Sequence, residues 1–204
     1  MKNNLIIIAE MACSHDGNIK IAKKIAKKAH NSGADIIQLQ MWKLENVVSP
    51  NNPNYNRIKE AEISSKGWTE IINYIRKKIK NILIYICLYE HNSIDFILSL
   101  KPDGLKINSS DLNNPLMLNK ISKLRIPINL SVGSSTVDEI NYALKFFKNK
   151  TNLNLMYGFQ SFPTPIDAIN IQNIKYLSKK YKLKVGYQDH SPGEDLSGFY
   201  LPAY

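Results

Sequence analysis

The chain alternates short apolar runs with longer amphipathic stretches along its whole length. Seven runs rich in Ile, Leu and Val predict strands, because a strand buried on both faces of a parallel sheet is continuously apolar. The predicted strands cover residues 5–10, 35–40, 82–88, 104–107, 126–131, 154–160 and 185–189.

Amphipathic stretches follow each of the first six predicted strands and indicate helices. In the first of them Ile21, Ile25 and Ala29 recur every four residues, and we expect this row to face the core. Pro115 and Thr136 suit the starts of two later helices. The predicted helices cover residues 18–32, 67–80, 93–100, 115–124, 137–147 and 168–181, and the polar stretch 46–66 predicts a loop with a short helical piece.

This alternation predicts a parallel α/β protein with helices on the sheet. Two architectures fit, a doubly wound open sheet and a (β/α)8 barrel of the TIM type. No G-x-G-x-x-G follows the first strand, so the dinucleotide-binding open sheet lacks its signature. In a parallel barrel the binding site forms at the carboxyl ends of the strands.

The charge balance first suggests nucleic acid as a partner. Lys and Arg number 27 against 17 Asp and Glu, a formal net charge of +10. Only three of the cations are arginines, the residue best suited to bidentate contacts with bases and phosphates, and the lysines fall on predicted helix faces. We therefore expect no nucleic-acid partner, although an attraction for small anions remains.

Two cysteines are too few for a disulfide framework and indicate a reducing compartment. The apolar run 5–9 is too short for a secretory signal or a membrane span. We therefore expect a cytoplasmic protein with no membrane partner.

Polar side chains stand at the predicted carboxyl ends of most strands. Together they comprise an ammonium group, hydroxyls, amides, carboxylates and imidazoles, which suit a phosphorylated or carboxylated ligand beside a divalent metal. The candidates are Glu10, Gln38, Lys106, Ser109, Asp111, Ser131, Gln160, Gln188 and His190.

Six segments, in order along nearly the whole chain, resemble the N-acetylneuraminate (sialic acid) synthase family. They read IAEMACSHDG at 8–17, GADIIQLQ at 33–40, LKINSSD at 105–111, PINLSVG at 127–133, GFQSFPTP at 158–165 and GYQDH at 186–190. The resemblance implies a (β/α)8 barrel, usually followed by a small antifreeze-like domain. It also implies condensation of phosphoenolpyruvate with an N-acetylhexosamine such as N-acetylmannosamine, giving a nonulosonic 2-keto acid and phosphate.

The same resemblance implies a cofactor, an assembly and residue roles. The cofactor is a divalent metal, Mn²⁺ before Mg²⁺ or Co²⁺, and the full-length form is a homodimer. Glu10 and Asp111 are the catalytic candidates: Glu10 as an acid/base group near the sugar, Asp111 in contact with the sugar or metal-bound water. The implied phosphoenolpyruvate ligands are Lys106, Ser109 and Ser131; Gln38, Gln160, Phe162 and Gln188 are further substrate contacts, and His190 is a metal ligand.

This chain departs from the family's pattern around the ligand, which leaves the acceptor sugar open. Gln38 stands where many members carry Lys, with Lys43 a few residues on as a compensating cation, and Cys87 stands where a hydroxyl follows the third strand. Gln160 replaces an Asn, Phe162 a Tyr and Gln188 a common Ser.

The family's eighth strand, with a Glu-Lys-His motif whose His is a second metal ligand, has no counterpart before residue 204. We therefore expect residues 1–204 to be an incomplete barrel cut after strand seven, part of a longer gene product that includes the antifreeze-like domain. Two alternatives stay open: another phosphoenolpyruvate-condensing aldolase of the 3-deoxy-keto-acid synthase type, and a truncated barrel without catalysis.

Overall fold

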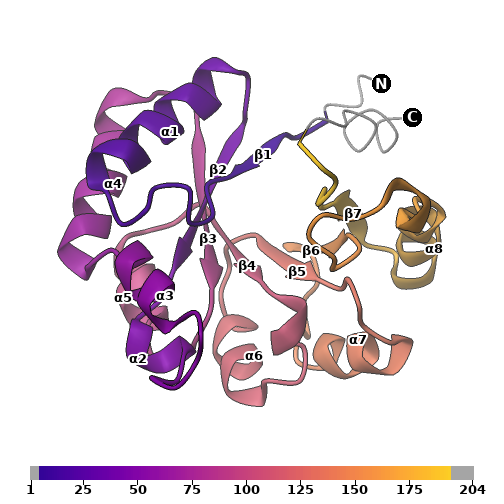
Figure 1. Ribbon diagram of the computed structural model, residues 1–204. Coiled ribbons are helices and arrows are strands. Elements are labelled where there is room, and N and C mark those ends of the chain that lie inside the picture. The colour runs from indigo at the N-terminus through magenta and orange to yellow at the C-terminus, as the bar shows by residue number, and fades with distance from the viewer. Residues whose placement is uncertain (1–4, 194–204) are drawn as a thin grey trace. The chain divides into compact units, whose positions relative to one another are not determined.

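The computed structural model describes residues 5–193 and divides into two compact units between Leu105 and Lys106 (Figure 1). All seven predicted strands are present in the described range. They are β1 (Ile8–Glu10), β2 (Ile36–Met41), β3 (Leu83–Leu88), β4 (Gly104–Ile107), β5 (Ile128–Ser131), β6 (Leu153–Tyr157) and β7 (Lys184–Tyr187).

Helices separate the strands throughout the described range, as the hydrophobic pattern predicts. The α-helices are α1 (Ile19–Asn31), α2 (Leu44–Val47), α3 (Tyr55–Ala61), α4 (Ser65–Lys78), α5 (Ile94–Ser99), α6 (Pro115–Ile121), α7 (Val137–Leu144) and α8 (Gln172–Tyr181). Two 3-10 turns, η1 (Ser109–Asp111) and η2 (Ile166–Ala168), follow β4 and β6. No helix within residues 5–193 has the length and apolar character needed to cross a membrane.

Neighbouring strands within each unit are parallel and are also neighbours in the chain. The first unit contains the order β1-β2-β3, with Glu10 opposite Gln38. The second contains β5-β6-β7, with Ser131 opposite Met156. In neither unit does the strand order reverse, whereas a doubly wound sheet reverses at its switch point. The order is consistent with the barrel-type interpretation.

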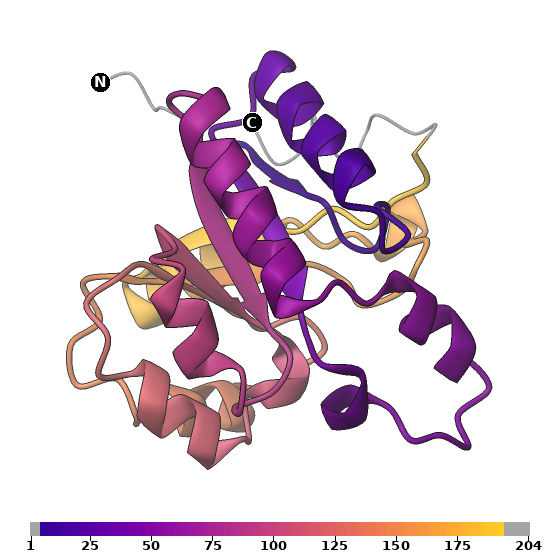
Figure 2. The same cartoon turned by 90° about the vertical axis from the view of Figure 1, so that its left-hand side faces the viewer.

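The buried face of α1 differs from the predicted one. Ala22 and Ala26 are buried, whereas Ile21 is 39% exposed. Helices α1 and α4 lie side by side (Figure 2), and small alanines allow their backbones to approach closely. The four-residue spacing was recognised correctly, but the row that packs is shifted by one residue.

The first predicted strand is shorter than its apolar run. Leu5, Ile6 and Ile7 are 66%, 62% and 47% exposed, and β1 begins only at Ile8. The reason is pairing, because the ladder with β2 starts at the pair Ile8 and Ile36. Hydrophobicity alone does not bury residues that lie before the ladder.

Helix starts in the second unit follow their capping signals. Asn114 accepts a hydrogen bond from the Met117 amide at 3.2 Å, with Pro115 in the first turn. Thr136 and Glu139 form a capping box. These caps fix where α6 and α7 begin, and therefore where the loops after β4 and β5 end.

Candidate functional site

The first unit places Glu10 at the carboxyl end of β1, where its side chain is exposed. The Gln40 side-chain amide donates a hydrogen bond to Glu10 Oε1 across the β1–β2 ladder. This bond ties one carboxylate oxygen of Glu10 to β2 and orients the side chain. Gln40 is therefore a positioning residue for the candidate acid/base group.

Gln38 and Lys43 occupy different environments. Gln38 is only 4% exposed, opposite Glu10 on one side and Tyr85 on the other. Lys43 is exposed and takes the N-cap position of α2. The buried Gln38 position therefore carries an amide, and the nearest cation along β2 lies beyond its end on the surface.

The hydroxyl after the third strand belongs to Tyr89. Cys87, which the resemblance places at a family hydroxyl, lies inside β3, within the predicted strand 82–88, and is fully buried. Tyr89 is the first residue after β3. Burial, reinforced by the nearby Cys87, Glu10 and Cys13, raises the pKa of Tyr89 far above its ordinary value. Its hydroxyl therefore stays protonated, within electrostatic range of Glu10.

The loop after β1 is organised around a buried imidazole. His15 Nδ1 accepts the Gly17 N–H at 3.0 Å, and its ring meets Trp68 edge-on at 5.5 Å. Burial lowers the pKa of His15, opposed by Asp16. A neutral His15 that accepts at Nδ1 carries its proton on Nε2, and it braces the loop that follows Glu10.

Lys106 is the buried cation of the second unit. It is 7% exposed in β4, between Leu105 and Ile107, which are fully buried. An ammonium group in such a setting is seldom found without a polar partner. Its position near the end of β4 matches the predicted anion-binding role.

Asp111 closes the 3-10 turn η1, which also contains Ser109. The Asn114 side-chain nitrogen Nδ2 donates to Asp111 Oδ1 at 3.2 Å. The Asn114 backbone N–H donates to the Asp111 backbone carbonyl at 3.1 Å. Burial raises the pKa of Asp111, with hydrogen bonds from Asn114 and Ser110 opposing it. The carboxyl group therefore holds a proton more readily than an exposed aspartate, as a general acid requires.

Ser131 and Gln188 form a direct hydrogen bond. Ser131 Oγ donates to Gln188 Oε1 at 2.6 Å, although β6 lies between their strands. Gly158 makes this possible, because a Cβ there would overlap the Gln188 carbonyl and come within 2.9 Å of Gln188 Cβ. The missing side chain at Gly158 lets Gln188 reach Ser131.

Gln160 repeats this arrangement one strand earlier. A Cβ on Gly133 would lie 2.8 Å from Gln160 Nε2, so the Gln160 side chain lies over that glycine. Because β6 ends at Tyr157 rather than at residue 160, Gln160 stands on a loop instead of a strand. Phe162, on the same loop, is 72% exposed and contacts the His190 ring at a centroid distance of 4.1 Å.

His190 is tied to the loop after β6. Its Nδ1 lies 2.7 Å from the Phe159 carbonyl oxygen. A carbonyl can only accept, so Nδ1 carries the proton, and in the neutral ring Nε2 presents its lone pair. In return the His190 carbonyl accepts the Thr164 N–H at 2.7 Å.

This tautomer fits one ligand of a divalent metal, since a ligating His usually donates its other N–H to a carbonyl or carboxylate. Residues 5–193 bring together no cluster of three His, Cys, Asp or Glu side chains suited to a metal ion. Among the described residues, His190 remains a candidate metal ligand, because its tautomer leaves Nε2 able to bind a metal ion.

Sequence reasoning missed Thr164, which is buried. Its hydroxyl lies 2.7 Å from the Ser161 carbonyl and 3.2 Å from the Phe159 carbonyl, so it holds the loop that carries Gln160 and Phe162. The sequence contains no signal for the partners of this hydroxyl.

Fold and site together define a parallel α/β protein with polar groups at the carboxyl ends of its strands, and its strand order is consistent with a TIM-type barrel. The NeuB family matches residues 25–198, and the chain belongs to this family. The resemblance to sialic acid synthases is thereby confirmed.

Two relatives and one solved structure are similar to this chain over most of its length. The chain is 30% identical over 97% of its length to the N,N'-diacetyllegionaminic acid synthase of Campylobacter jejuni, of which it covers 64%. It is 32% identical over 92% of its length to an uncharacterised protein of Methanocaldococcus jannaschii, of which it covers 56%. It also resembles the crystal structure of sialic acid synthetase from Leptospira borgpetersenii, at 28% identity and a TM-score of 0.88, covering 95% of this chain and 68% of that one. The chain thus spans somewhat over half the length of the curated relatives it matches.

Proposed function

We propose that the protein takes part in the condensation of phosphoenolpyruvate with an N-acetylhexosamine, giving a nonulosonic 2-keto acid and phosphate. One observation carries the proposal: the carboxyl ends of β5 to β7 hold together the Ser131–Gln188 pair and a His190 whose Nε2 presents a lone pair. The Gln188 amide, whose nitrogen is a donor, and a metal-competent imidazole at the carboxyl ends of these strands suit an anionic substrate and an aldehyde acceptor.

Phosphoenolpyruvate is the substrate for which Lys106 and Ser131 are best suited. The Lys106 ammonium offsets negative charge, and a buried cation acts more strongly than an exposed one. Ser131 supplies a hydroxyl whose orientation Gln188 controls. Ser109 is a further donor for the same ligand, and Gln38, in the first unit, is proposed as a substrate contact with an amide in place of a second cation.

Glu10 is proposed to move a proton at the acceptor sugar as carbon 3 of phosphoenolpyruvate bonds to the aldehyde carbon. Gln40 orients its carboxylate and Tyr89 adds a protonated hydroxyl beside it. Asp111, with its raised pKa, is the second acid/base candidate. Gln160 and Phe162 would contact the acceptor, Phe162 through an exposed aromatic face that suits the C–H face of a sugar ring.

A divalent metal, Mn²⁺ before Mg²⁺ or Co²⁺, would be held by His190 Nε2. When bound there it supplies Lewis-acid polarisation of the acceptor aldehyde. The chain's own contribution is to fix the ring through the Phe159 carbonyl, so that Nε2 faces outward with its lone pair.

Phosphate release from phosphoenolpyruvate tests the proposal. The assay uses the 204-residue chain and the complete gene product with Mn²⁺ and a panel of N-acetylhexosamines, with mass spectrometry of the 2-keto acid. Lys106→Met should reduce kcat/KM for phosphoenolpyruvate about 100-fold, since bonds to a charged group contribute roughly 1.5–3 kcal/mol. Lys145→Met, an exposed lysine after α7, is the matched control and should leave the rate unchanged. No release with any N-acetyl sugar would overturn the proposal.

The same assay separates the alternatives. Release only with phosphorylated aldoses as acceptors would favour the 3-deoxy-keto-acid synthase type. Binding of phosphoenolpyruvate without turnover by the complete gene product would favour a non-catalytic barrel. The cytoplasm and a homodimeric full-length form remain part of the proposal and are tested by fractionation and by sedimentation.

A further inference from the structure

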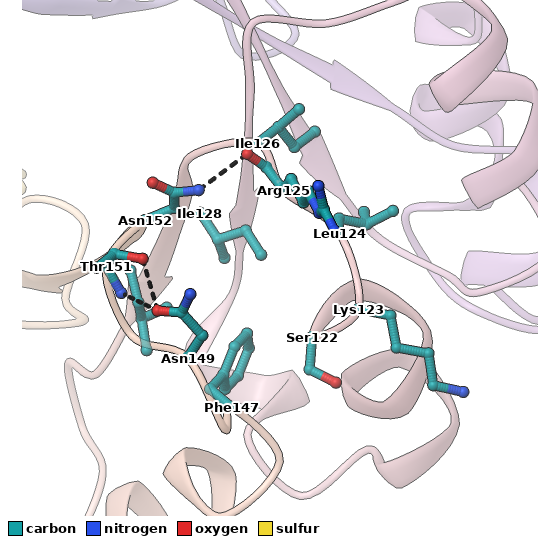
Figure 3. Close-up of a pocket in the computed structure, with 11 residues that line it drawn as sticks. Ser122, Lys123, Leu124, Arg125, Ile126, Ile128, Phe147, Asn149, Thr151 and Asn152 are labelled. Carbon is teal, nitrogen blue, oxygen red and sulfur yellow. Dashed lines mark hydrogen bonds between the residues drawn. The ribbon is translucent and has the colours of Figure 1, made fainter.

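The second unit has a cavity at the end of β5 and β6 opposite its candidate site. The cavity measures about 190 Å³ and is lined by eleven residues from the segments 122–128 and 147–153, which lead into the two strands; Pro127, Lys148 and Lys150 are not among them (Figure 3). Ser131 and Gly158 lie at the other ends of the same strands, one strand length away. The cavity is therefore separate from the groups assigned to phosphoenolpyruvate and the sugar.

The floor of this cavity is apolar. Ile128, Phe147 and Leu153 are nearly fully buried, and Ile128 and Phe147 point into the same space in Figure 3. Pockets for drug-sized ligands usually measure about 300–1,000 Å³, so this one suits a smaller molecule or one compact group. Its occupant needs an apolar body.

The rim is cationic and offers a fixed donor. Of the eleven lining residues, Lys123 and Arg125 are basic and none is acidic. Asn149 Oδ1 accepts the Thr151 N–H at 2.9 Å and the Thr151 hydroxyl at 2.5 Å. Because both bonds need a carbonyl oxygen, the Asn149 amide nitrogen must face the other way, and Figure 3 shows it turned from Thr151.

The surrounding sequence adds charge of the same sign. Residues 120–127 and 145–152, which lead into β5 and β6, contain no Asp or Glu and six Lys or Arg: Lys120, Lys123, Arg125, Lys145, Lys148 and Lys150. No ion pair involves Lys123 or Arg125 among the described residues. The field at this end therefore favours an anion.

We propose that this cavity binds a small organic anion, a carboxylate or phosphate on a compact apolar body. The body lies on Ile128 and Phe147, and the anionic group takes the Arg125 guanidinium and the Asn149 amide N–H. Lys123 extends away from the floor in Figure 3 and contributes charge at the rim rather than a contact.

The proposed anion site is tested by titrating the full chain with phenyl phosphate, benzoate and neutral benzyl alcohol. Binding is monitored by NMR of the Ile methyl groups. Both anions should shift Ile128 and leave Ile166, on η2, unshifted, with a Kd of about 1 mM or tighter. Benzyl alcohol should bind at least about tenfold more weakly, as loss of one charge-assisted bond predicts. Comparing the two anions identifies whether carboxylate or phosphate is preferred.

Asn149→Asp is the decisive variant, because aspartate still accepts both Thr151 bonds but replaces the donor with a negative charge. It should keep the thermal midpoint and weaken anion binding at least about tenfold, and Arg125→Met should weaken it similarly. Lys148→Met, which removes an equal charge outside the lining, should change the Kd less than about twofold. No Ile128 shift with either anion would overturn the proposal, and so would an affinity in Asn149→Asp and Arg125→Met equal to that of the unaltered chain.

Discussion

The two units hold their candidate groups by different means. In the first, β2 and β3 share a ladder of six residue pairs, and Glu10 and Gln40 meet as neighbours on paired strands. In the second, β5 to β7 share ladders of only four pairs; Ser131 meets Gln188 because Gly158 leaves room, and Gln160 lies over Gly133. The first arrangement depends on strand pairing and the second on close packing, so single substitutions should affect them differently.

The units can be followed separately in one experiment. Both tryptophans, Trp42 and Trp68, lie in the first unit and are buried there. Tryptophan fluorescence therefore reports the first unit, whereas far-UV circular dichroism reports both.

Gly158→Ala should have the largest effect. The new Cβ would overlap the Gln188 carbonyl, and overpacking of this kind costs about 1–3 kcal/mol. The circular dichroism transition in urea should shift while the tryptophan transition stays in place, and exchange of the Gln188 amide should accelerate. Gly193→Ala, where a Cβ meets nothing within 4 Å, is the control. An unchanged transition would show that the close approach is not needed.

Glu10→Gln should reduce turnover about 100-fold without changing the stability of either unit, since a positioned acid/base group contributes about 10²–10⁴-fold. The measurement is phosphate release at saturating substrate, beside both urea transitions. Glu45→Gln, an exposed acid on α2, serves as the control. Full activity in Glu10→Gln would remove Glu10 from the reaction.

Gln188→Ala should have a smaller effect. Loss of the Ser131 hydrogen bond costs about 1 kcal/mol of the second unit's stability. KM for phosphoenolpyruvate should change more than kcat, because Ser131 loses its orientation rather than its hydroxyl. Gln172→Ala, at the exposed start of α8, is the matched control. A change in kcat alone would contradict the positioning role.

Protonation of His15 should have the smallest effect, a change in the stability of the first unit alone. Burial lowers its folded-state pKa below the unfolded value of about 6.5. The unfolded chain therefore takes up a proton that the folded unit resists, so stability is fully present above pH 6.5 and falls as the pH drops below it. The urea midpoint by tryptophan fluorescence should show this decline.

His15→Asn should flatten that dependence, because its side-chain carbonyl still accepts the Gly17 N–H as an Asx turn but does not titrate in this range. If the decline below pH 6.5 persists in the variant, another group causes it.

Most of the fold could be predicted, because strands and helices are local patterns. The seven apolar runs, the capping of α6 and α7 and the candidate groups near strand ends were all readable from the sequence. Exact strand ends were not: β1 begins at Ile8 rather than at residue 5 and β6 ends at Tyr157 rather than at residue 160, since pairing with the neighbouring strand, rather than hydrophobicity, decides where a strand starts and stops.

By itself the sequence determined the kinds of groups available and the family. Those are properties of residue types and of their order, so they need no coordinates. The tertiary structure decided which groups meet: the Glu10 orientation by Gln40, the Ser131 hydrogen bond to Gln188 over Gly158, and the His190 tautomer. Each depends on atoms from different strands or loops approaching within 3 Å or so, and no pattern along a single chain specifies that distance.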